Sequence, residues 1–261
     1  MISKKDYERI IGKRIRYDVV LKSQTAAELI KKYKKGKLKI LDIGSGHGLI
    51  TFFLEKEWEY YGIDVDEERL RRSKKIKLKN VKFFLRDAEN FNFKHKFDVI
   101  LALDIIEHLG HPKKCIKLVS EHLDDDGIFI VSNPNKHGLW AFFFDSKNKT
   151  SKITTFIFNL NFVQNLLKKK KLMENWEDKY YKKGLHEHKH HWSPKEFAEM
   201  TKKYGLNLIE VLPRPVFSEG IGWLIKDYRR FQNLDSNLGR LFPQFATGWF
   251  LVFRKNHPYL A

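Results

Sequence analysis

Leu41-Asp42-Ile43-Gly44-Ser45-Gly46-His47-Gly48 is the stretch that decides the fold class of this chain. It continues the apolar run that begins at Leu38, and it carries an acidic residue and three closely spaced glycines. This pattern predicts a strand, a tight turn and the start of a helix near Leu49. Glycine lets the backbone adopt positive φ and lets a ligand come close, and a helix start supplies unpaired N–H groups. We therefore interpret the stretch as a ligand-binding turn.

The spacing of these glycines narrows the class of ligand. A dinucleotide fingerprint has the spacing G-x-G-x-x-G and presents its amides to a pyrophosphate, whereas this turn reads G-x-G-x-G. The carboxylate of Asp42 would repel a pyrophosphate. It suits a ligand with an ammonium and a sulfonium group, which describes S-adenosylmethionine. The turn therefore favours a methyl donor over a nicotinamide cofactor.

Polar side chains follow three further expected strands. These strands are Glu59–Asp64, Val81–Leu85 and Phe97–Leu103. Asp64 lies twenty positions after Gly44, where a ribose-binding acid is expected in a βαβ unit. Asp87 and Ala88 follow the next strand, where an adenine edge would lie, and Asp104–Leu109 follows the last one. Because ligands of open parallel sheets bind at the carboxyl ends of the strands, we expect all these residues to converge on one crevice.

The region from Lys39 to Asn135 resembles the class I S-adenosylmethionine-dependent methyltransferases. The matching motifs are Asp42–Gly48, Asp64, Asp87-Ala88, Ile106–Leu109, and the turn Leu123–Gly127 before the expected strand Ile128–Asn135. The I-E-H-L and S-x-P-N elements are most similar to the branch that contains ubiquinone-biosynthesis O-methyltransferases and many sugar, lipid and small-molecule O-methyltransferases. The resemblance implies a Rossmann-like α/β fold with a seven-stranded, mostly parallel sheet whose last strand is antiparallel.

The resemblance also implies how the site is composed. The residues expected to bind the donor are Asp42, Gly44, Ser45, Gly46, Gly48, Asp64, Asp87, Ala88 and Asp104. Because the sulfonium already activates the methyl group, the enzyme must hold an acceptor oxygen in line and remove its proton. His108 is the first candidate for the base because it follows the fourth strand, and His188 is the second. We expect O-methylation of a small or lipid-linked acceptor; a catalytically silent donor-binding or scaffold protein is an open alternative.

A metal-dependent RNA enzyme is another open alternative. Four imidazoles lie within His186–His191, and three residues after the fourth strand have the i, i+3, i+4 spacing of one helix face. With Trp192–Phe197, this combination resembles the metal-dependent small-RNA 3′-terminal 2′-O-methyltransferases, although Asp104 stands where that family has Glu. The ligands that this resemblance implies for a divalent cation are Asp104, Glu107, His108 and His188.

Length and composition favour one methyltransferase domain over residues 1–261 with a helical cap inserted at 137–184. A single cysteine, Cys115, excludes a disulfide framework and favours a reducing compartment. The charged N-terminal residues are followed by no long apolar run, which argues against a signal peptide and for a cytoplasmic protein. No stretch is long enough to span a bilayer.

The basic character of the chain leaves its partner open. A formal charge of +18 and a pI near 9.7 suit nucleic acid, anionic membrane or acidic substrates, but lysines spread over solvated helix faces give the same total. In the insertion, an apolar stripe at helical spacing precedes Lys168–Lys171. We interpret Trp140–Trp176 as a helical cap over the substrate end of the sheet. Peripheral contact with an anionic membrane through the lysines is the alternative.

The last part of the chain is expected to complete the sheet. Ser193 is placed as the N-cap of a helix, with Pro194 at its first position and Glu196 at N3 in a capping box. Two apolar runs, Leu206–Val211 and Trp249–Phe253, then predict the final pair of strands.

Overall fold

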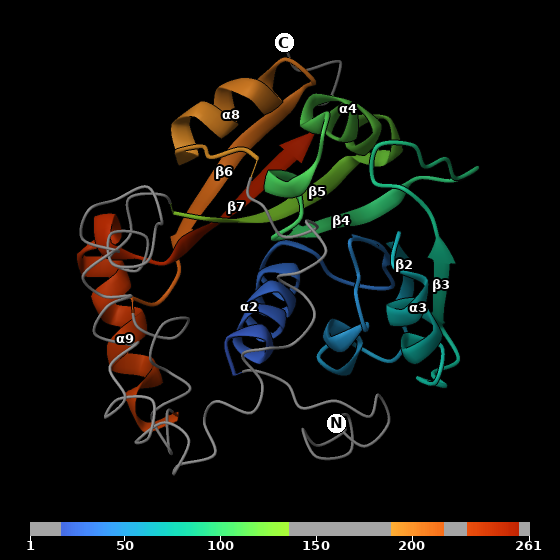
Figure 1. Cartoon of the computed structure of the whole chain (residues 1–261), viewed down its shortest axis with the longest axis horizontal. Helices are drawn as coiled ribbons and strands as arrows, with labels where there is room; N and C mark the ends of the chain where they lie inside the picture. The colour runs from blue at the N-terminus through green and yellow to red at the C-terminus, as the bar shows by residue number, and fades with distance from the viewer. Residues whose placement is uncertain (1–16, 136–188, 217–228, 256–261) are drawn as a thin grey trace, which may run out of the picture. The chain divides into compact units, whose positions relative to one another are not determined.

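The computed structural model describes residues 17–135, 189–216 and 229–255 (Figure 1). In these residues seven strands form one sheet in the order β3-β2-β1-β4-β5-β7-β6. The strands are β1 Lys39–Ile43, β2 Glu59–Asp64, β3 Val81–Leu85, β4 Phe97–Leu103, β5 Leu123–Pro134, β6 Leu206–Pro213 and β7 Gly248–Lys255. The sheet is mostly parallel, and β7 is antiparallel, as the Rossmann-like methyltransferase fold requires.

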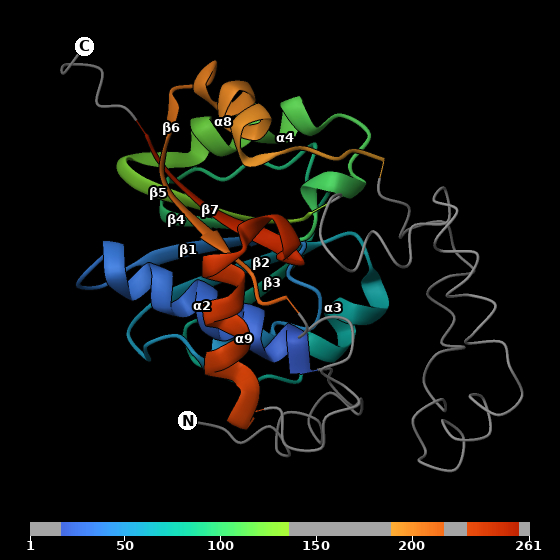
Figure 2. The same ribbon diagram turned by 90° about the vertical axis from the view of Figure 1, so that its left-hand side faces the viewer.

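Helices cover both faces of this sheet. The α-helices are α2 Tyr17–Tyr33, α3 Glu67–Ser73, α4 Pro112–His122, α8 Pro194–Lys202 and α9 Arg229–Leu241. Three single 3-10 turns accompany them at Leu49–Phe52, Ile106–His108 and Pro243–Phe245. Figure 2 shows α4 and α8 on one face of the sheet and α2 and α3 on the other. This layered arrangement buries the central strands completely: Ile40, Leu41 and Ile100 have no exposed surface.

Parallel pairing aligns the carboxyl ends of the strands that precede the predicted site. In β1, Ile43 pairs with Ile63 of β2 on one side and with Ala102 of β4 on the other. The loops after these three strands therefore begin at the same edge of the sheet.

The local sequence patterns predict most of these elements correctly. The bounds of β2, β3 and β4 are the three predicted runs, and the last two predicted strands correspond to β6 and β7. The capping box of α8 is also confirmed, because the Ser193 amide donates to Glu196 Oε2 at 2.7 Å and the Glu196 amide donates to Ser193 Oγ at 3.2 Å. Each of these patterns is complete within a few residues of sequence.

Two local expectations are wrong. The helix expected from Leu49 is only the 3-10 turn Leu49–Phe52, in which Ile50, Thr51 and Phe52 are β-branched or aromatic and have lower helix propensity. The turn expected at Leu123–Gly127 is part of β5 instead. Its first residue, Leu123, is fully buried and pairs with Phe97, and the register then shifts so that Ile128 pairs with Val99. The acidic residues between them form an irregular stretch of the strand.

The chain divides into two compact units. The described residues of the first are 17–133, 192–211 and 250–255, and those of the second are 134–135, 189–191, 212–216 and 229–249. In the second, Asp235 of α9 accepts the Val216 amide at 2.8 Å. The predicted cap at 137–184 lies outside the described residues, so the arrangement of one domain with a cap remains a prediction. Within the described part of the chain, no helix is long and apolar enough to cross a membrane.

Candidate donor-binding and catalytic site

The glycine turn after β1 is held against the end of β2 by its own backbone. The amides of Gly44 and Ser45 both donate to the Ile63 carbonyl at 2.9 Å, and the Gly46 amide donates to Asp64 Oδ2 at 2.8 Å. The three glycines have φ values of 72°, 54° and 72° in chain order. The turn is therefore a left-handed loop whose shape is fixed by hydrogen bonds to the neighbouring strand.

Gly46 and Gly48 are needed for different reasons. A Cβ atom on Gly48 would lie 2.5 Å from Phe83 Cζ, so the ring of the β3 residue excludes any side chain there. A Cβ atom on Gly46 would meet nothing within 4 Å. The backbone of Gly46 therefore borders open space, which a ligand can occupy at close approach to the chain.

Asp64 connects the turn to the loop after β2. Its Oδ2 accepts the Gly46 amide, its Oδ1 accepts the Asp66 amide at 2.8 Å, and the side chain is 7% exposed. Each carboxylate oxygen has a second lone pair, so both hydroxyls of a ribose can still be accepted. The geometry suits the predicted role, and it adds a structural one, because the same carboxylate fixes the glycine turn.

Asp42 is a buried carboxyl at the end of β1. It is 4% exposed, and the Tyr60 hydroxyl donates to its Oδ2 at 2.6 Å. Burial raises the pKa of Asp42 to about 7, and the charge of Asp64 adds to this rise, while the hydrogen bond from Tyr60 opposes it. A ligand that brings positive charge to this position would favour the ionised carboxylate.

The loop after β3 is tied to the loop after β4 by a residue that the motifs did not indicate. Asp87 is exposed and its Oδ1 accepts the Glu89 amide at 2.8 Å, while Ala88 is buried. Glu89 Oε1 accepts the amides of Gly110 at 2.6 Å and His111 at 2.9 Å. Glu89 therefore sets the distance between the predicted adenine-binding loop and the candidate catalytic loop.

Asp104 occupies a strained position directly after β4. Its φ of 51° is the only positive value at a non-glycine residue in the described part of the chain. Ser132 Oγ donates to its Oδ1 at 2.6 Å, and the ammonium of Lys22, from α2, forms an ion pair with its Oδ2. Lys22 lies 82 positions away in sequence, so no local pattern could have indicated this partner.

Glu107 and His108 lie in the short 3-10 turn that follows Asp104. Glu107 is 1% exposed, and its Oε1 lies 3.9 Å from Nε2 of His108. The imidazole remains 17% exposed. The carboxylate thus lies within ion-pair distance of an imidazole that is still open to solvent, a combination from which a general base can be built.

The described residues do not fit the predicted metal site. In residues 17–135, 189–216 and 229–255, no three His, Cys, Asp or Glu side chains are arranged to hold a metal ion. Asp104 does not share a helix face with Glu107 and His108, because it precedes the 3-10 turn in a left-handed conformation. Both of its oxygens already have partners in Lys22 and Ser132. His188 lies outside the described residues, so its role remains a prediction.

The structure thus brings the predicted donor residues together in groups. The groups are Asp42, Gly44, Ser45, Gly46, Gly48 and Asp64 at the ends of β1 and β2, Asp87 and Ala88 after β3, and Asp104 after β4. The sheet order places β4 directly beside β1. The loop after β4, which carries the candidate base, therefore begins next to the glycine turn.

Comparison with known proteins identifies the family. A family of methyltransferase domains matches residues 34–203, well over half of the chain. The (S)-coclaurine N-methyltransferase of Papaver somniferum is 29% identical over 126 residues, which are 46% of this chain and 36% of that protein. The ubiquinone biosynthesis O-methyltransferase of Pelagibacter ubique is 34% identical over 104 residues, which are 38% of this chain and 43% of that protein.

The matched segments thus span well under half of these curated relatives. The fold itself is shared over almost the whole chain. The crystal structure of a SAM-dependent methyltransferase from Aquifex aeolicus superimposes with a TM-score of 0.53 and 11% identity, covering 98% of this chain and 100% of that one. This chain therefore belongs to the class I S-adenosylmethionine-dependent methyltransferases.

Proposed function

We propose that this protein transfers the methyl group of S-adenosylmethionine to an oxygen atom of a small or lipid-linked acceptor. The observation that carries the proposal is the Glu107–His108 pair, which follows the strand next to the glycine turn. A methyl donor held by that turn needs a base nearby, and this pair supplies one.

The residues around the turn suit each part of the donor. The open space beside Gly46 lets the donor approach the protein backbone closely, and the carboxylate of Asp64 accepts the ribose hydroxyls. Asp42 balances the positive charge of the ligand. Because Asp42 is buried, this charge balance is stronger than it would be in water.

The reaction then needs one proton transfer. The acceptor hydroxyl gives its proton to the His108 imidazole while the oxygen attacks the methyl carbon and the carbon–sulfur bond breaks. The sulfonium leaves as the neutral thioether of S-adenosylhomocysteine. Glu107 stabilises the imidazolium that forms. General-base help of this kind is worth about 10²- to 10⁴-fold in rate, with the rest supplied by positioning.

The alternatives differ in the acceptor. One of the relatives is named as an N-methyltransferase and the other as an O-methyltransferase, so nitrogen is the competing acceptor atom. A neutral amine attacks before it loses its proton, so a base matters less to that reaction. The metal-dependent RNA reaction has weaker support, because Asp104, Glu107 and His108 do not fit a shared cation site.

We further propose a cytoplasmic protein, with Lys168–Lys171 as the segment for any contact with anionic membrane.

The test compares two histidine variants on the full chain. Isotopically labelled donor is incubated with pools of metabolites, lipids and RNA, and the methylated products are identified by mass spectrometry. We expect an O-methylated small or lipid product, and a kcat about 10²- to 10⁴-fold lower in His108→Gln with unchanged donor affinity. His111→Gln is the matched control, because this exposed imidazole makes no capping bond at the start of α4.

Three results would contradict the proposal in different ways. A methylated nitrogen on the product would replace the acceptor class, and methylated RNA that requires a divalent cation would favour the RNA enzyme. Donor binding without any methylated product in the three pools would favour a catalytically silent protein.

A further inference from the structure

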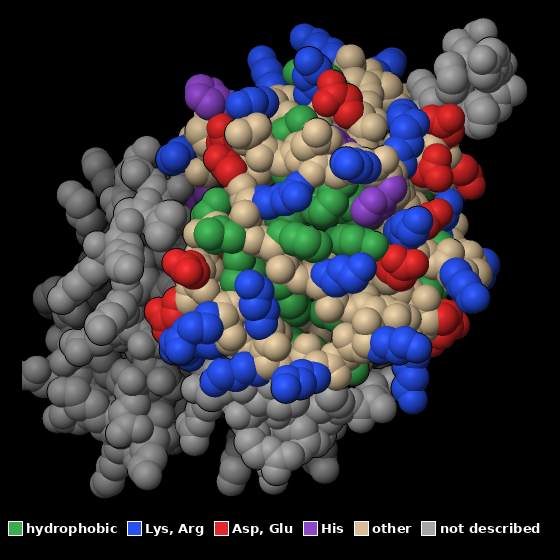
Figure 3. Space-filling view, turned by 90° about the vertical axis from the view of Figure 1, so that its right-hand side faces the viewer, with side chains coloured by type: hydrophobic (Ala, Val, Ile, Leu, Met, Phe, Trp, Pro, Cys, Tyr) green, Lys and Arg blue, Asp and Glu red, His purple; other side chains and the backbone are tan. Residues whose placement is uncertain are grey.

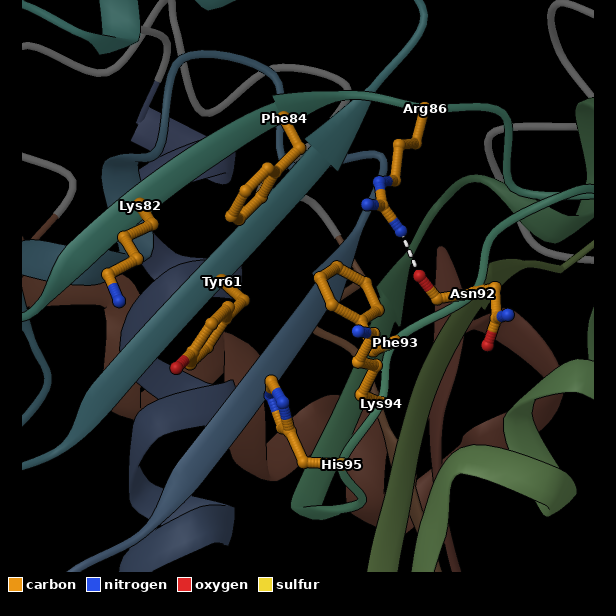
Figure 4. Close-up of a pocket in the computed structure, with 8 residues that line it drawn as sticks. All are labelled: Tyr61, Lys82, Phe84, Arg86, Asn92, Phe93, Lys94 and His95. Carbon is orange, nitrogen blue, oxygen red and sulfur yellow. Dashed lines mark hydrogen bonds between the residues drawn. The ribbon is translucent and has the colours of Figure 1, made fainter.

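A second site lies on the β2–β3 part of the sheet, away from the glycine turn. Residues 86–96, all described, return from β3 to β4 without forming a helix. The loop and the two strands enclose an open pocket of about 570 Å³ (Figure 4). Its lining residues are Tyr61, Lys82, Phe84, Arg86, Asn92, Phe93, Lys94 and His95.

The pocket opens on the face of β2 opposite to the one that carries the side chain of Tyr60. Tyr60 directs its hydroxyl to Asp42, which belongs to the donor-binding residues. Tyr61 is the next residue in the strand, so its side chain points to the other face of the sheet. A ligand in this pocket would therefore lie on the face of the sheet away from Tyr60 and Asp42, and no residue of the glycine turn lines it.

Three aromatic rings lie close together in this pocket. The rings of Tyr61 and Phe84 are parallel, with 6° between their planes and 6.2 Å between their centroids. The ring of Phe93 stands nearly perpendicular to both, at 81° and 80°. Because Phe84 is partly exposed and Tyr61 is buried beneath the rim, a planar ligand ring can stack on Phe84.

Positive charge surrounds these rings. Lys82 and Lys94 are exposed, and the Lys82 ammonium lies 5.4 Å from the centroid of Tyr61. The guanidinium of Arg86 lies 4.4 Å from the centroid of Phe93 and is held there by a hydrogen bond to the Asn92 carbonyl (Figure 4). None of the described residues that line the pocket is acidic. Figure 3 shows the corresponding side of the molecule, where hydrophobic side chains are bordered by many Lys and Arg side chains and by some Asp and Glu.

We propose that this pocket binds one base of a single-stranded nucleic acid, with Lys82, Arg86 and Lys94 at the flanking phosphates. Aromatic stacking combined with cations along the backbone is the chemistry by which proteins hold single strands without reading their sequence. The formal charge of +18 on the chain adds a general attraction for such a polyanion.

The depth of the rings favours a nucleic acid over a membrane. Tyr61 is only 7% exposed and lies below exposed lysines, so a flat lipid surface would meet the lysines and leave the rings unfilled. A single strand can turn one base into the pocket while its phosphates stay at the rim. Burial also lowers the pKa of His95, so its ring is mainly neutral at pH 7 and adds a further uncharged aromatic surface.

The test measures binding of a fluorescent oligouridine of about 12 nucleotides to the full chain by anisotropy, over a series of salt concentrations. Lys82→Gln combined with Lys94→Gln should reduce the slope of log K against log salt by about 1.4, at ~0.7 for each of two lost phosphate contacts. Phe84→Leu keeps an apolar side chain but removes the ring on which the base stacks. It should weaken binding about fivefold or more, the equivalent of at least 1 kcal/mol per stacked base.

The control removes the same charge elsewhere. Lys195→Gln combined with Lys202→Gln changes two exposed lysines of α8, outside the pocket, and should leave affinity within about twofold of the wild type. Donor affinity, measured by calorimetry, should be unchanged in every variant and shows that each is folded.

Three results would overturn the proposal. Equal weakening by the pocket pair and the α8 pair would mean that only total charge matters. Competition by uridine monophosphate at the same concentration as the oligouridine would make the pocket a site for free nucleotides. Binding to vesicles that contain phosphatidylserine, lost in the pocket variants while oligouridine binding stays, would assign the surface to lipid.

Discussion

The two sides of β2 show how one strand supports two different kinds of site. Tyr60 is 1% exposed and its hydroxyl donates to a buried carboxyl, whereas Tyr61 is 7% exposed and its hydroxyl donates to half-buried Glu59 at 2.9 Å. On the Tyr60 side, backbone amides and carboxylates fix the geometry. On the Tyr61 side, rings and flexible cations form the surface. Removing a single atom on the Tyr60 side should therefore lower the stability of the protein strongly. Substitutions on the Tyr61 side should act mainly by changing its charge.

The largest effect is expected from Asp42→Asn and depends on pH. The folded-state pKa of Asp42 is about 7, above the ordinary value of 3.8 for this group, so between these values the folded protein holds a proton that the unfolded chain has lost. The stability that Asp42 contributes to the wild type therefore falls as the pH rises between these two pKa values. Asparagine does not titrate, so the variant should gain up to about 4 kcal/mol relative to the wild type between pH 4 and pH 8.

Urea denaturation of both proteins over this pH range measures the difference. Two stability curves that stay parallel from pH 4 to pH 8 would show that Asp42 is not held neutral. Saturating donor supplies positive charge beside the ionised carboxylate of the wild type, so it should reduce the difference at pH 8.

Gly48→Ala should have the next largest effect. The φ of 72° disfavours alanine, and the new Cβ would also meet Phe83 Cζ at 2.5 Å. Together these should lower the free energy of unfolding by about 3 kcal/mol and weaken donor binding. Gly36→Ala is the matched control, since Gly36 has a φ of 80° and nothing within 4 Å of a Cβ. It should lose only about 1 kcal/mol, and similar losses in the two variants would mean that Phe83 gives way.

Tyr60→Phe and Tyr61→Phe compare the two sides directly. Each variant removes one hydroxyl that donates to a carboxylate. The bond to Asp42 is buried, so its loss should cost about 2 kcal/mol at pH 8 and raise the pKa of Asp42 further. The bond to Glu59 is near solvent, and its loss should cost about 0.5 kcal/mol. A larger loss in Tyr61→Phe, measured by urea denaturation, would reverse the contrast between the two sides.

Lys82→Gln should have the smallest effect on folding. Its contact with the ring of Tyr61 is an exposed cation–π interaction worth about 0.5 kcal/mol. We expect the melting temperature to change little and donor affinity to stay the same. A clearly destabilised variant would show that the cations of the pocket support the fold as well as the surface.

The sequence predicted the strands and the turn because their determinants are local. Each of β2, β3 and β4 is an apolar run that ends near a carboxylate, and the glycines mark the turn by their spacing alone. The glycine pattern predicts that a helix follows the turn but not its length, which the low helix propensity of Ile50, Thr51 and Phe52 limits to a single 3-10 turn.

The partners of the site residues could not be predicted from local patterns. Lys22 reaches Asp104, and Glu89 reaches the loop after β4, across 82 and 21 positions of sequence. The aromatic pocket has the same origin, since Phe93 belongs to a connecting loop and meets Tyr61 only when the sheet has formed. Contacts of this kind depend on the topology of the sheet, which sets which loops become neighbours.

The position of β7 has a consequence for how the chain is made. This strand, Gly248–Lys255, is the last of the seven in sequence, yet it lies between β5 and β6 in the sheet. While the chain emerges from the ribosome, β5 and β6 both have an unpaired edge until residue 255 is available. Exposed strand edges promote aggregation, so translation that stops before residue 248 should yield an aggregating fragment with the whole donor site encoded but the sheet incomplete.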